Sequence, residues 1–272
     1  MRNIVISGGT DGIGRALALH HLRAGDRVLV IGRSADKGTR LAREADAGDR
    51  LHVIRADLSL VSENRRVIEE VADRLGHVDA LVLCAAHLRM KRLVTNEDLE
   101  FSFALAYLSR FLLSTGIVPL MRDAEAPVIV NLAVVGAGPR AMNWDDLQFT
   151  AKHSGSKVWA QTRRANELLA VGFAREHRTS EIKYVMFNPV YVRSSFSGEF
   201  AKPVRFVISA LGALFAKPAE EAIQPIVELI ERPPAQELSF YKAAEKQDRT
   251  PTQVDVEDAE RLYRETKRIL ND

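Results

Sequence analysis

Short runs of apolar residues, rich in valine and isoleucine, recur along the chain between longer amphipathic stretches. Both alternating sets of positions within each run are apolar, which is typical of strands buried between two layers of helices. The predicted strands are Ile4–Ser7, Arg27–Ile31, Leu51–Arg55, Ala80–Cys84, Val128–Leu132 and Lys183–Phe187.

The stretches between these runs carry apolar residues at helical spacing. The predicted helices are Ile13–Ala24, Ser34–Ala45, Leu60–Arg74, Asn96–Met121, Val158–His177 and Thr252–Leu270. Strands that alternate with helices predict a parallel sheet with right-handed crossovers and helices on both faces. The chain has no internal repeat and no second domain, so we predict one doubly wound α/β domain over residues 1–272, with a mostly parallel central sheet.

Two segments interrupt the alternation. Residues 144–157 are polar and aromatic, and Ser194–Pro218 contain an apolar run, Phe206–Ala216, with basic residues around it. Ligands of doubly wound folds bind outside the carboxyl ends of the strands, so we interpret Ser194–Pro218 as a lid over a substrate pocket. A core-packing helix, or the subunit interface of a homo-oligomer, would explain the same apolar run equally well.

Composition excludes several classes of protein. The 38 lysines and arginines nearly balance 36 acidic residues, for a net charge of +2, which argues against nucleic-acid binding. The 11 residues of Phe206–Ala216 are fewer than the roughly 20 that span a bilayer, so we expect no membrane span. One cysteine, and seven histidines without metal-ligand spacing, give no support for a metal site. Without a secretory leader, the expected location is cytoplasmic.

A glycine-rich segment joins the first predicted strand to the first predicted helix. It reads Ser7-Gly8-Gly9-Thr10-Asp11-Gly12-Ile13-Gly14-Arg15. Glycines let the backbone approach a pyrophosphate, and the helix N-terminus offers free N–H groups and the positive end of its dipole. A plain tight turn is the alternative, but this position between strand and helix is the context expected of a dinucleotide-binding loop. We therefore predict a Rossmann domain.

The glycine spacing G-x-x-x-G-x-G resembles the nucleotide-binding motif of the short-chain dehydrogenases/reductases. Asp57, after the third strand, looks like the family's adenine-contacting aspartate. Residues 143–148 look like the insert of its retinol-dehydrogenase-like members, and residues 188–194 are similar to the family's loop beside the nicotinamide. The resemblance covers nearly the whole chain and implies an oxidoreductase with a nicotinamide cofactor.

The end of the second strand predicts which nicotinamide cofactor is bound. An NAD site places a carboxylate there, whereas an NADP site places positive charge. The strand ends Gly32-Arg33 and Arg15 adds a second cation, so we predict NADP(H), unless Arg33 is only a solvated loop residue. The predicted cofactor-binding residues are Gly8, Thr10, Asp11, Gly12, Ile13, Gly14, Arg15, Arg33, Asp57, Leu58, Cys84, Ala85, Arg163, Pro189 and Val192.

The resemblance also implies four positions for redox chemistry, which in the family hold Asn, Ser, Tyr and Lys. Here they hold Ala106, Val134, Trp159 and Arg163. Tryptophan does not titrate and valine cannot hydrogen-bond a carbonyl oxygen. Arginine, with a pKa of about 12 or more, is a poor proton shuttle. We therefore expect a degenerate catalytic tetrad that leaves nucleotide binding intact.

A second alignment competes with this one. His153 and Lys157 mimic the family's Tyr and Lys but would require a gap after Lys157. The alignment on Trp159 and Arg163 keeps its intervals to both flanking motifs, with Trp159 standing 25 positions after Val134. We therefore adopt the second alignment.

Tyr191, His153 and Arg163 are the candidates for substitute catalytic roles. Tyr191 follows the nicotinamide loop, although a packing aromatic is the simpler explanation. His153 titrates near neutrality, although a histidine on a surface loop is common.

Three functions stay open. The first is an NADP(H)-dependent reductase that transfers hydride to an activated carbonyl or imine-type small molecule without enzyme-derived protons. The second is a non-redox enzyme, such as a cyclase, on the same fold. The third is an inactive NADP(H)-binding regulator. We favour the first because the glycine loop, Arg33 and Asp57 are present while the proton-transfer residues are not.

Overall fold

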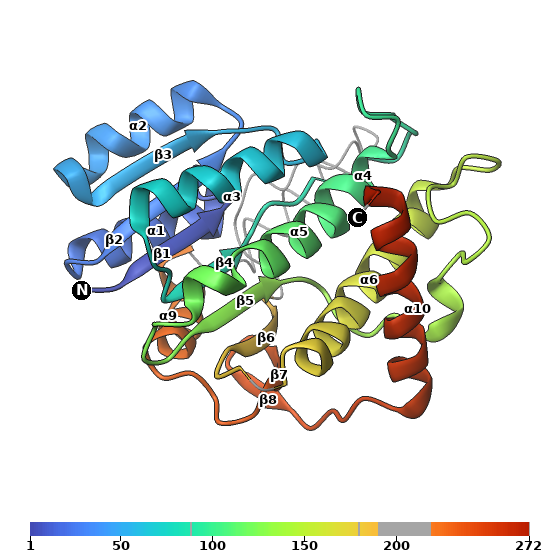
Figure 1. Ribbon diagram of the computed structural model, residues 1–272. Helices are drawn as coiled ribbons and strands as arrows, with labels where there is room; N and C mark the ends of the chain where they lie inside the picture. The colour runs from blue at the N-terminus through green and yellow to red at the C-terminus, as the bar shows by residue number, and fades with distance from the viewer. Residues whose placement is uncertain (88, 179, 190–218, 272) are drawn as a thin grey trace.

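A computed structural model describes residues 1–87, 89–178, 180–189 and 219–271. Its centre is one eight-stranded sheet in the order β3-β2-β1-β4-β5-β6-β7-β8 (Figure 1). The strands are β1 (Asn3–Ser7), β2 (Arg27–Gly32), β3 (Leu51–Arg55), β4 (Ala80–Leu83), β5 (Val128–Leu132), β6 (Lys183–Asn188), β7 (Leu238–Lys242) and β8 (Glu245–Gln247). Strands β1 to β7 are parallel and β8 pairs antiparallel with β7. The predicted single α/β domain with a mostly parallel sheet is confirmed.

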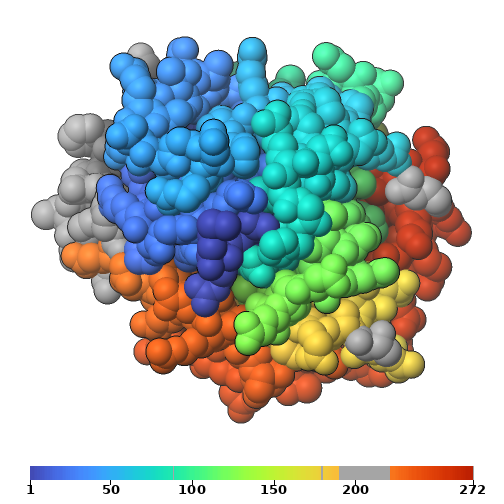
Figure 2. Space-filling view, turned by 60° about the vertical axis from the view of Figure 1, so that its left-hand side comes forward, coloured from blue at the N-terminus to red at the C-terminus, as the bar shows by residue number. Residues whose placement is uncertain are grey.

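Helices cover both faces of this sheet. They are α1 (Gly12–Arg23), α2 (Ala35–Ala45), α3 (Val61–Leu75), α4 (Phe101–Phe103), α5 (Ser109–Gly116), α6 (Gly155–Glu176), α8 (Ala219–Ala222), α9 (Gln224–Glu231) and α10 (Gln253–Leu270). One buried cluster joins the sheet to α3, α5, α6 and α10, and the other joins it to α1 and α9. In the space-filling view, blue and cyan segments occupy the upper part of the visible face, and yellow and orange segments the lower part (Figure 2).

The C-terminal helix α10 lies along α6 (Figure 1). The Arg164 side chain of α6, which is buried, donates to Asp255 Oδ1 at 2.5 Å and to Asp258 Oδ2 at 3.2 Å. Asp255 also completes a capping box with Thr252 at the start of α10. This buried ion cluster fixes α6, and hence the side chains that α6 carries, against the body of the domain.

The predicted helix Asn96–Met121 is interrupted. Val94 and Glu100 form an isolated antiparallel bridge, and Asp98 between them has a φ of 56°. The helical course begins only at Phe101, because the Glu100 carboxylate accepts from Phe103 N at 2.7 Å and caps it. A π-helical segment (Ala104–Leu108) then connects α4 to α5.

Candidate functional site

The carboxyl ends of the parallel strands bring the predicted site residues to one edge of the sheet. Gly8 follows β1, Arg33 follows β2 and Asp57 follows β3. Ala85 and Val134 follow β4 and β5 in the same way. The strand order reverses between β1 and β4, and the crevice at such a reversal is where doubly wound folds bind their ligands.

The glycine loop has a shape that side chains would disrupt. Gly8 and Gly12 have φ values of 69° and 51°, in the region that favours glycine. A Cβ on Gly14 would lie 2.5 Å from the Gly8 carbonyl oxygen, and one on Gly8 would lie 2.8 Å from Ala85 N. The backbone therefore turns tightly at the reversal and leads directly into α1, as a pyrophosphate cradle requires.

The first turn of α1 carries no acidic residue. The side chain of Asp11 accepts a hydrogen bond from Gly12 N at 2.8 Å and forms an ion pair with Lys37 of α2. Thr10 is buried and packs where a side chain on Gly32 would otherwise lie. The Ile13 side chain is half-buried. No carboxylate within the first turn of α1 therefore competes with a bound phosphate for the free amide groups of this turn.

An open cleft of about 510 Å³ lies beyond the ends of β2 and β3. It is lined by Arg33, Arg55, Ala56, Asp57 and Glu63. Asp57 Oδ1 accepts from the amide and the hydroxyl of Ser59, at 3.0 and 2.7 Å. The predicted residues Arg33 and Asp57 therefore lie in one cleft, beside the buried Leu58.

Two other predicted cofactor residues have different surroundings. Arg15 forms an ion pair with Glu44 at the protein surface, so its charge already has a partner within the protein. Burial raises the pKa of the Cys84 thiol to about 12, which keeps it protonated at neutral pH. Cys84 can therefore line the site but does not supply a thiolate nucleophile.

Trp159 and Arg163 lie one turn apart on α6 and contact each other. The Arg163 guanidinium carbon lies 5.2 Å from the centroid of the Trp159 ring, and Arg163 Nη2 donates to Val135 O at 2.9 Å. Trp159 and Val134 are each about two-fifths exposed, at 41% and 37%. The structure thus brings Trp159, Arg163 and the segment after β5 together at the carboxyl edge of the sheet.

Ala106 lies in the π-helical segment, where the helical hydrogen bonds are displaced. Its carbonyl oxygen accepts from Asn166 Nδ2 of α6 at 2.8 Å. The Ala106 position is therefore joined to α6, three residues beyond Arg163. Two of the four predicted tetrad positions, Trp159 and Arg163, therefore lie on α6. Val134 follows β5, and Ala106 is hydrogen-bonded to α6.

A buried polar network lies beneath this region and was missed from the sequence. Arg110 of α5 donates to Asn131 Oδ1 at 2.5 Å and to Ala85 O at 3.2 Å. Asn131 Nδ2 donates to Asn166 Oδ1 at 3.1 Å and to the Tyr184 hydroxyl at 3.0 Å. Burial lowers the pKa of Arg110 to about 10, so the guanidinium stays charged at neutral pH. The signal available in the sequence was a single cation inside the apolar run 108–113.

His153 lies away from an open site. Its Nε2 atom is buried and lies 3.8 Å from Oε1 of the buried Glu100, and neither atom has a hydrogen bond to another described residue. Tyr107, in the π-helical segment, is also buried. Its hydroxyl lies 2.6 Å from the Thr266 hydroxyl, and burial raises the pKa of Tyr107 above its ordinary value. The side chains of His153 and Tyr107 therefore point into the protein.

The predicted Tyr191, Val192 and lid Ser194–Pro218 lie outside the described residues, and Pro189, just before them, is half-buried.

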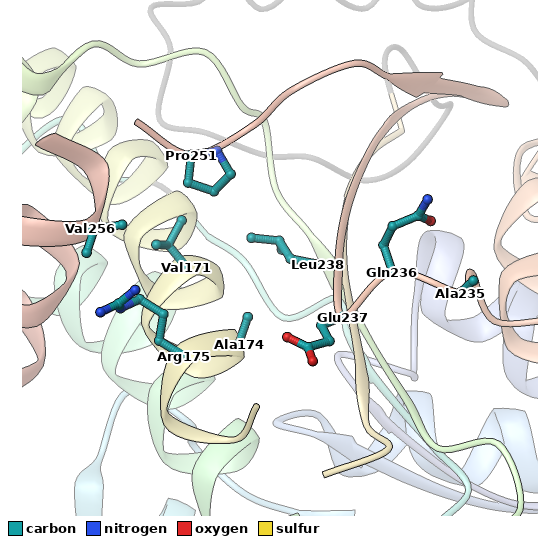
Figure 3. Close-up of a pocket in the computed structure, with 9 residues that line it drawn as sticks. All are labelled: Val171, Ala174, Arg175, Ala235, Gln236, Glu237, Leu238, Pro251 and Val256. Carbon is teal, nitrogen blue, oxygen red and sulfur yellow. The ribbon is translucent and has the colours of Figure 1, made fainter. Parts of the chain in front are cut away.

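A second cleft, of about 530 Å³, opens between α6 and the start of β7 (Figure 3). Its lining residues are Val171, Ala174, Arg175, Ala235, Gln236, Glu237, Leu238, Pro251 and Val256. Because β7 is parallel to β6, its first residue, Leu238, lies at the amino edge of the sheet, opposite the glycine loop. This cleft is therefore separate from the predicted nucleotide site.

The described residues contain neither a metal-ligand cluster nor a helix suited to spanning a membrane. No cluster of three or more His, Cys, Asp or Glu side chains in this part of the chain could hold a metal ion. Nor is any described helix both long and apolar enough to cross a membrane.

Comparison with known proteins gives a consistent answer. Human retinol dehydrogenase 13 is 22% identical over 279 residues, which cover 99% of this chain and 84% of that protein. A solved structure of an uncharacterized protein from Mycobacterium paratuberculosis matches with a TM-score of 0.77 at 19% identity, over 100% of this chain and 94% of the other. A Shigella flexneri protein assigned to the short chain dehydrogenases, solved with NADP, matches with a TM-score of 0.68 at 15% identity, over 90% and 97%. These two structures show the shared fold.

The family relationship follows from the larger part of the chain. A sequence model described as short chain dehydrogenase matches residues 2–203, which include the glycine loop, Asp57 and α6. The retinol dehydrogenase relative extends the match to nearly the full length. The chain belongs to the short-chain dehydrogenase family, and its resemblance to the retinol-dehydrogenase-like members is confirmed.

Proposed function

We propose that this protein binds NADP(H) and transfers hydride to an activated carbonyl or imine-type small molecule, with any proton supplied by solvent or substrate. The observation that carries the proposal is the contrast within one site. The glycine loop keeps the backbone shape of a pyrophosphate cradle, whereas the expected proton-donor position holds Trp159, stacked on Arg163. A substrate that needs hydride but no proton from the enzyme is compatible with both features.

The residues present fit a dinucleotide cofactor. Gly8, Gly12 and Gly14 would admit its pyrophosphate, because a Cβ at Gly14 would close the turn against Gly8. Arg33 and Asp57 line the cleft beside this loop, where the adenosine half would lie. When bound, the reduced cofactor supplies a hydride.

The side chains at the reacting end can bind and orient a substrate but cannot relay a proton. The Arg163 guanidinium donates to Val135 O and lies over the Trp159 ring. Val134 and Trp159 present apolar surface. A positioned acid contributes typically about 10²–10⁴-fold in rate, so we expect slow reduction of unactivated ketones.

An iminium ion would avoid this limitation. Hydride adds to its carbon to form a C–H bond, the C=N π electrons become the nitrogen lone pair, and the product is a neutral amine. The substrate loses its positive charge as the cofactor gains one, so the step balances without a proton. A carbonyl, by contrast, yields an alkoxide that solvent or a substrate group must protonate.

The first test is calorimetric titration with NADPH and NADH, followed by mixing the NADPH complex with a stable cyclic iminium salt. We expect tighter binding of NADPH and an amine product in proportion to NADPH consumed. Reactions without protein, and with the Gly14→Ala variant, measure the background. Failure to take up NADPH would contradict the proposal, as would an iminium that is consumed no faster than in that background. Conversion of the iminium, at equal rates with NADPH and NADP⁺, to a product of unchanged oxidation state would favour the non-redox alternative.

A further inference from the structure

Two residues of α6 hold the segment that follows β5. Arg163 Nη2 donates to Val135 O at 2.9 Å. One helical turn later, Glu167 Oε1 accepts hydrogen bonds from the backbone amides of Gly136 and, at 3.4 Å, Ala137. A Cβ on Gly136 would lie 4.0 Å from Arg163 Nη2, so the two sets of contacts are adjacent. Because residues four apart lie on the same face of a helix, one face of α6 supplies both a donor and an acceptor to this segment.

The Glu167 carboxylate is buried, with only 1% of the residue exposed, and both of its oxygens have partners. Oε2 accepts from Arg249 Nη2 at 2.6 Å and lies 3.6 Å from Arg164 Nη1. Arg249 lies between β8 and α10, and its guanidinium carbon is 5.0 Å from the centroid of the Phe240 ring of β7. Oε1 therefore binds the segment after β5, while Oε2 is paired with a residue of the C-terminal part of the chain. Charge-assisted hydrogen bonds are the strong ones, so these contacts restrict the carboxylate to one orientation.

The backbone after β5 depends on contacts of this kind. The ladder with β6 ends at Leu132, and Ala133 N then donates to Phe187 O at 3.0 Å. Gly136 has a φ of 97°, in the region that favours glycine, so the chain turns there. Val134 lies between these points and is 37% exposed. Beyond the ladder, hydrogen bonds to α6 therefore fix the course of the segment that carries Val134.

We infer that Glu167 is a positioning residue for the reacting end, because its carboxylate fixes the segment Val134–Ala137, and that Arg249 holds this carboxylate in place. The inference rests on the proposed function, because this segment and Arg163 are the parts that would face the substrate. Arg249 lies outside residues 2–203, which the family model matches. The C-terminal part of the chain therefore helps to shape the reacting end through Glu167.

The first measurement is hydrogen–deuterium exchange of the whole protein, read by mass spectrometry on peptides that contain Gly136 and Ala137. In Glu167→Met these peptides should exchange about 10- to 100-fold faster, because hydrogen bonds to a charged acceptor are lost. Glu167→Gln keeps a carbonyl acceptor for the Gly136 amide but loses the charge that pairs with Arg249, so its exchange should be intermediate. Arg249→Met keeps the acceptor itself and should accelerate exchange less than Glu167→Met does.

The second measurement compares the reacting end with the nucleotide end. The KM for the cyclic iminium should rise about tenfold in Glu167→Met, as for the loss of a hydrogen bond, and recover in part in Glu167→Gln. Adenosine 2′,5′-bisphosphate is a probe that occupies only the adenosine half of the cofactor site. Its affinity should stay within about twofold, because Glu167 does not line the cleft that contains Arg33 and Asp57.

Two variants serve as controls. Glu176→Gln changes an exposed residue of the same type on the same helix and should leave both measurements unchanged. Asp255→Asn weakens the same buried ion cluster through Arg164, and so tests for a purely structural role. It should lower stability while leaving the exchange of the segment and the KM for the iminium within about twofold.

Several results would overturn this inference. One is unchanged exchange in folded Glu167→Gln and Arg249→Met, which also decide the matter if Glu167→Met does not fold. Another is equal acceleration in Asp255→Asn and Glu167→Gln, which would show general loosening of the fold. Faster exchange with an unchanged KM for the iminium would likewise contradict a positioning role. A wild type that binds no NADPH overturns the proposed function, while the exchange measurement still decides whether Glu167 fixes the segment.

Discussion

The two ends of the site lie on the same edge of one sheet but depend on different parts of the protein. The nucleotide end is defined by backbone shape, through the positive φ of Gly8 and the close approach of Gly14 to Gly8. The reacting end depends on side-chain atoms, and there Trp159 and Val134 supply no titrating group. If the proposed roles are right, cofactor binding and proton transfer depend on different atoms, so a chain can lose one without losing the other.

A buried hydrogen-bond network supports the helices and strands beneath the reacting end. Arg110, Asn131 and Asn166 satisfy one another in the interior, and Asn166 also bonds the carbonyl of Ala106. Such a network is costly to disrupt, because each buried polar group left without a partner costs about 1–3 kcal/mol. The network therefore fixes α6 through buried contacts that do not involve the side chains of Val134, Trp159 or Arg163.

The largest expected effect comes from restoring the proton-transfer residues. The triple variant Val134→Ser, Trp159→Tyr and Arg163→Lys should raise the rate of NADPH-dependent reduction of simple ketones by about 10²–10⁴-fold, the usual contribution of a positioned acid. The measurement is the single-turnover rate of ketone reduction. Trp159→Phe within the same background supplies the ring without the hydroxyl and serves as the control. No gain over that control would show that the two ends are not independent and that the pocket itself differs.

Gly14→Ala tests the opposite end. The added Cβ would lie 2.5 Å from the Gly8 carbonyl oxygen, so the loop must open. We expect NADPH affinity to fall at least about 100-fold, because the amides that would face the pyrophosphate are displaced. Gly138→Ala is the matched control, since no atom lies within 4 Å of its added Cβ. Circular dichroism establishes that both variants fold, and undiminished binding by folded Gly14→Ala would contradict the cradle.

Sequence alone predicted the six strands β1 to β6 because each contains a short, nearly continuous apolar run, and all of them except the partly buried edge strand β3 are largely buried. Strands β7 and β8 were not predicted, because neither contains a continuous apolar run. They are the last two strands of the sheet, Leu238–Lys242 is mixed in polarity and Glu245–Gln247 is polar throughout. The sequence also did not predict that the helix begins at Phe101 instead of Asn96. This start depends on the Glu100 cap, and the apolar pattern shows no break there.

The site was predictable where it depends on local sequence and unpredictable where distant charges meet. The glycine loop and Asp57 could be placed from their positions after strands. The pairing of Arg15 with Glu44 joins residues 29 apart on different helices, and no pattern announces it. The position of Arg55 in one cleft with Arg33 likewise appears only once β3 lies beside β2. The predicted roles of Ala106, Val134, Trp159 and Arg163 stay predictions that the variants above test.

A third variant tests whether the stability of the fold can be lowered without changing the affinity for the nucleotide. Asp255→Asn weakens the buried cluster with Arg164 that holds α10 on α6, so we expect the free energy of unfolding to fall by about 2–4 kcal/mol. The affinity for adenosine 2′,5′-bisphosphate should not change. Urea unfolding and calorimetry measure the two quantities. Asp145→Asn, at an exposed position, is the control, and equal losses in both variants would contradict the role of the cluster.

The same carboxylate predicts a pH dependence. Burial alone would raise the pKa of Asp255, but hydrogen bonds from Thr252 and Arg164 outweigh burial and hold the pKa below its ordinary value of 3.8. A carboxyl whose pKa is lower in the folded state contributes its full stability above its unfolded pKa. That contribution is lost as the pH falls through the folded pKa. The stability difference between wild type and Asp255→Asn should therefore narrow below about pH 4. A difference that stays constant down to pH 2 would contradict this assignment.

The smallest expected effect concerns the contact between Trp159 and Arg163. The indole is 41% exposed, so its interaction with the guanidinium is screened by water, and Trp159→Leu should lower the free energy of unfolding by only about 0.5–1 kcal/mol. A double-mutant cycle with Arg163→Gln isolates the coupling between the two side chains. A coupling well above this range would mean that the pair is a structural support of α6. A small coupling would leave both side chains free to contact a substrate, as the contrast between the two ends of the site requires.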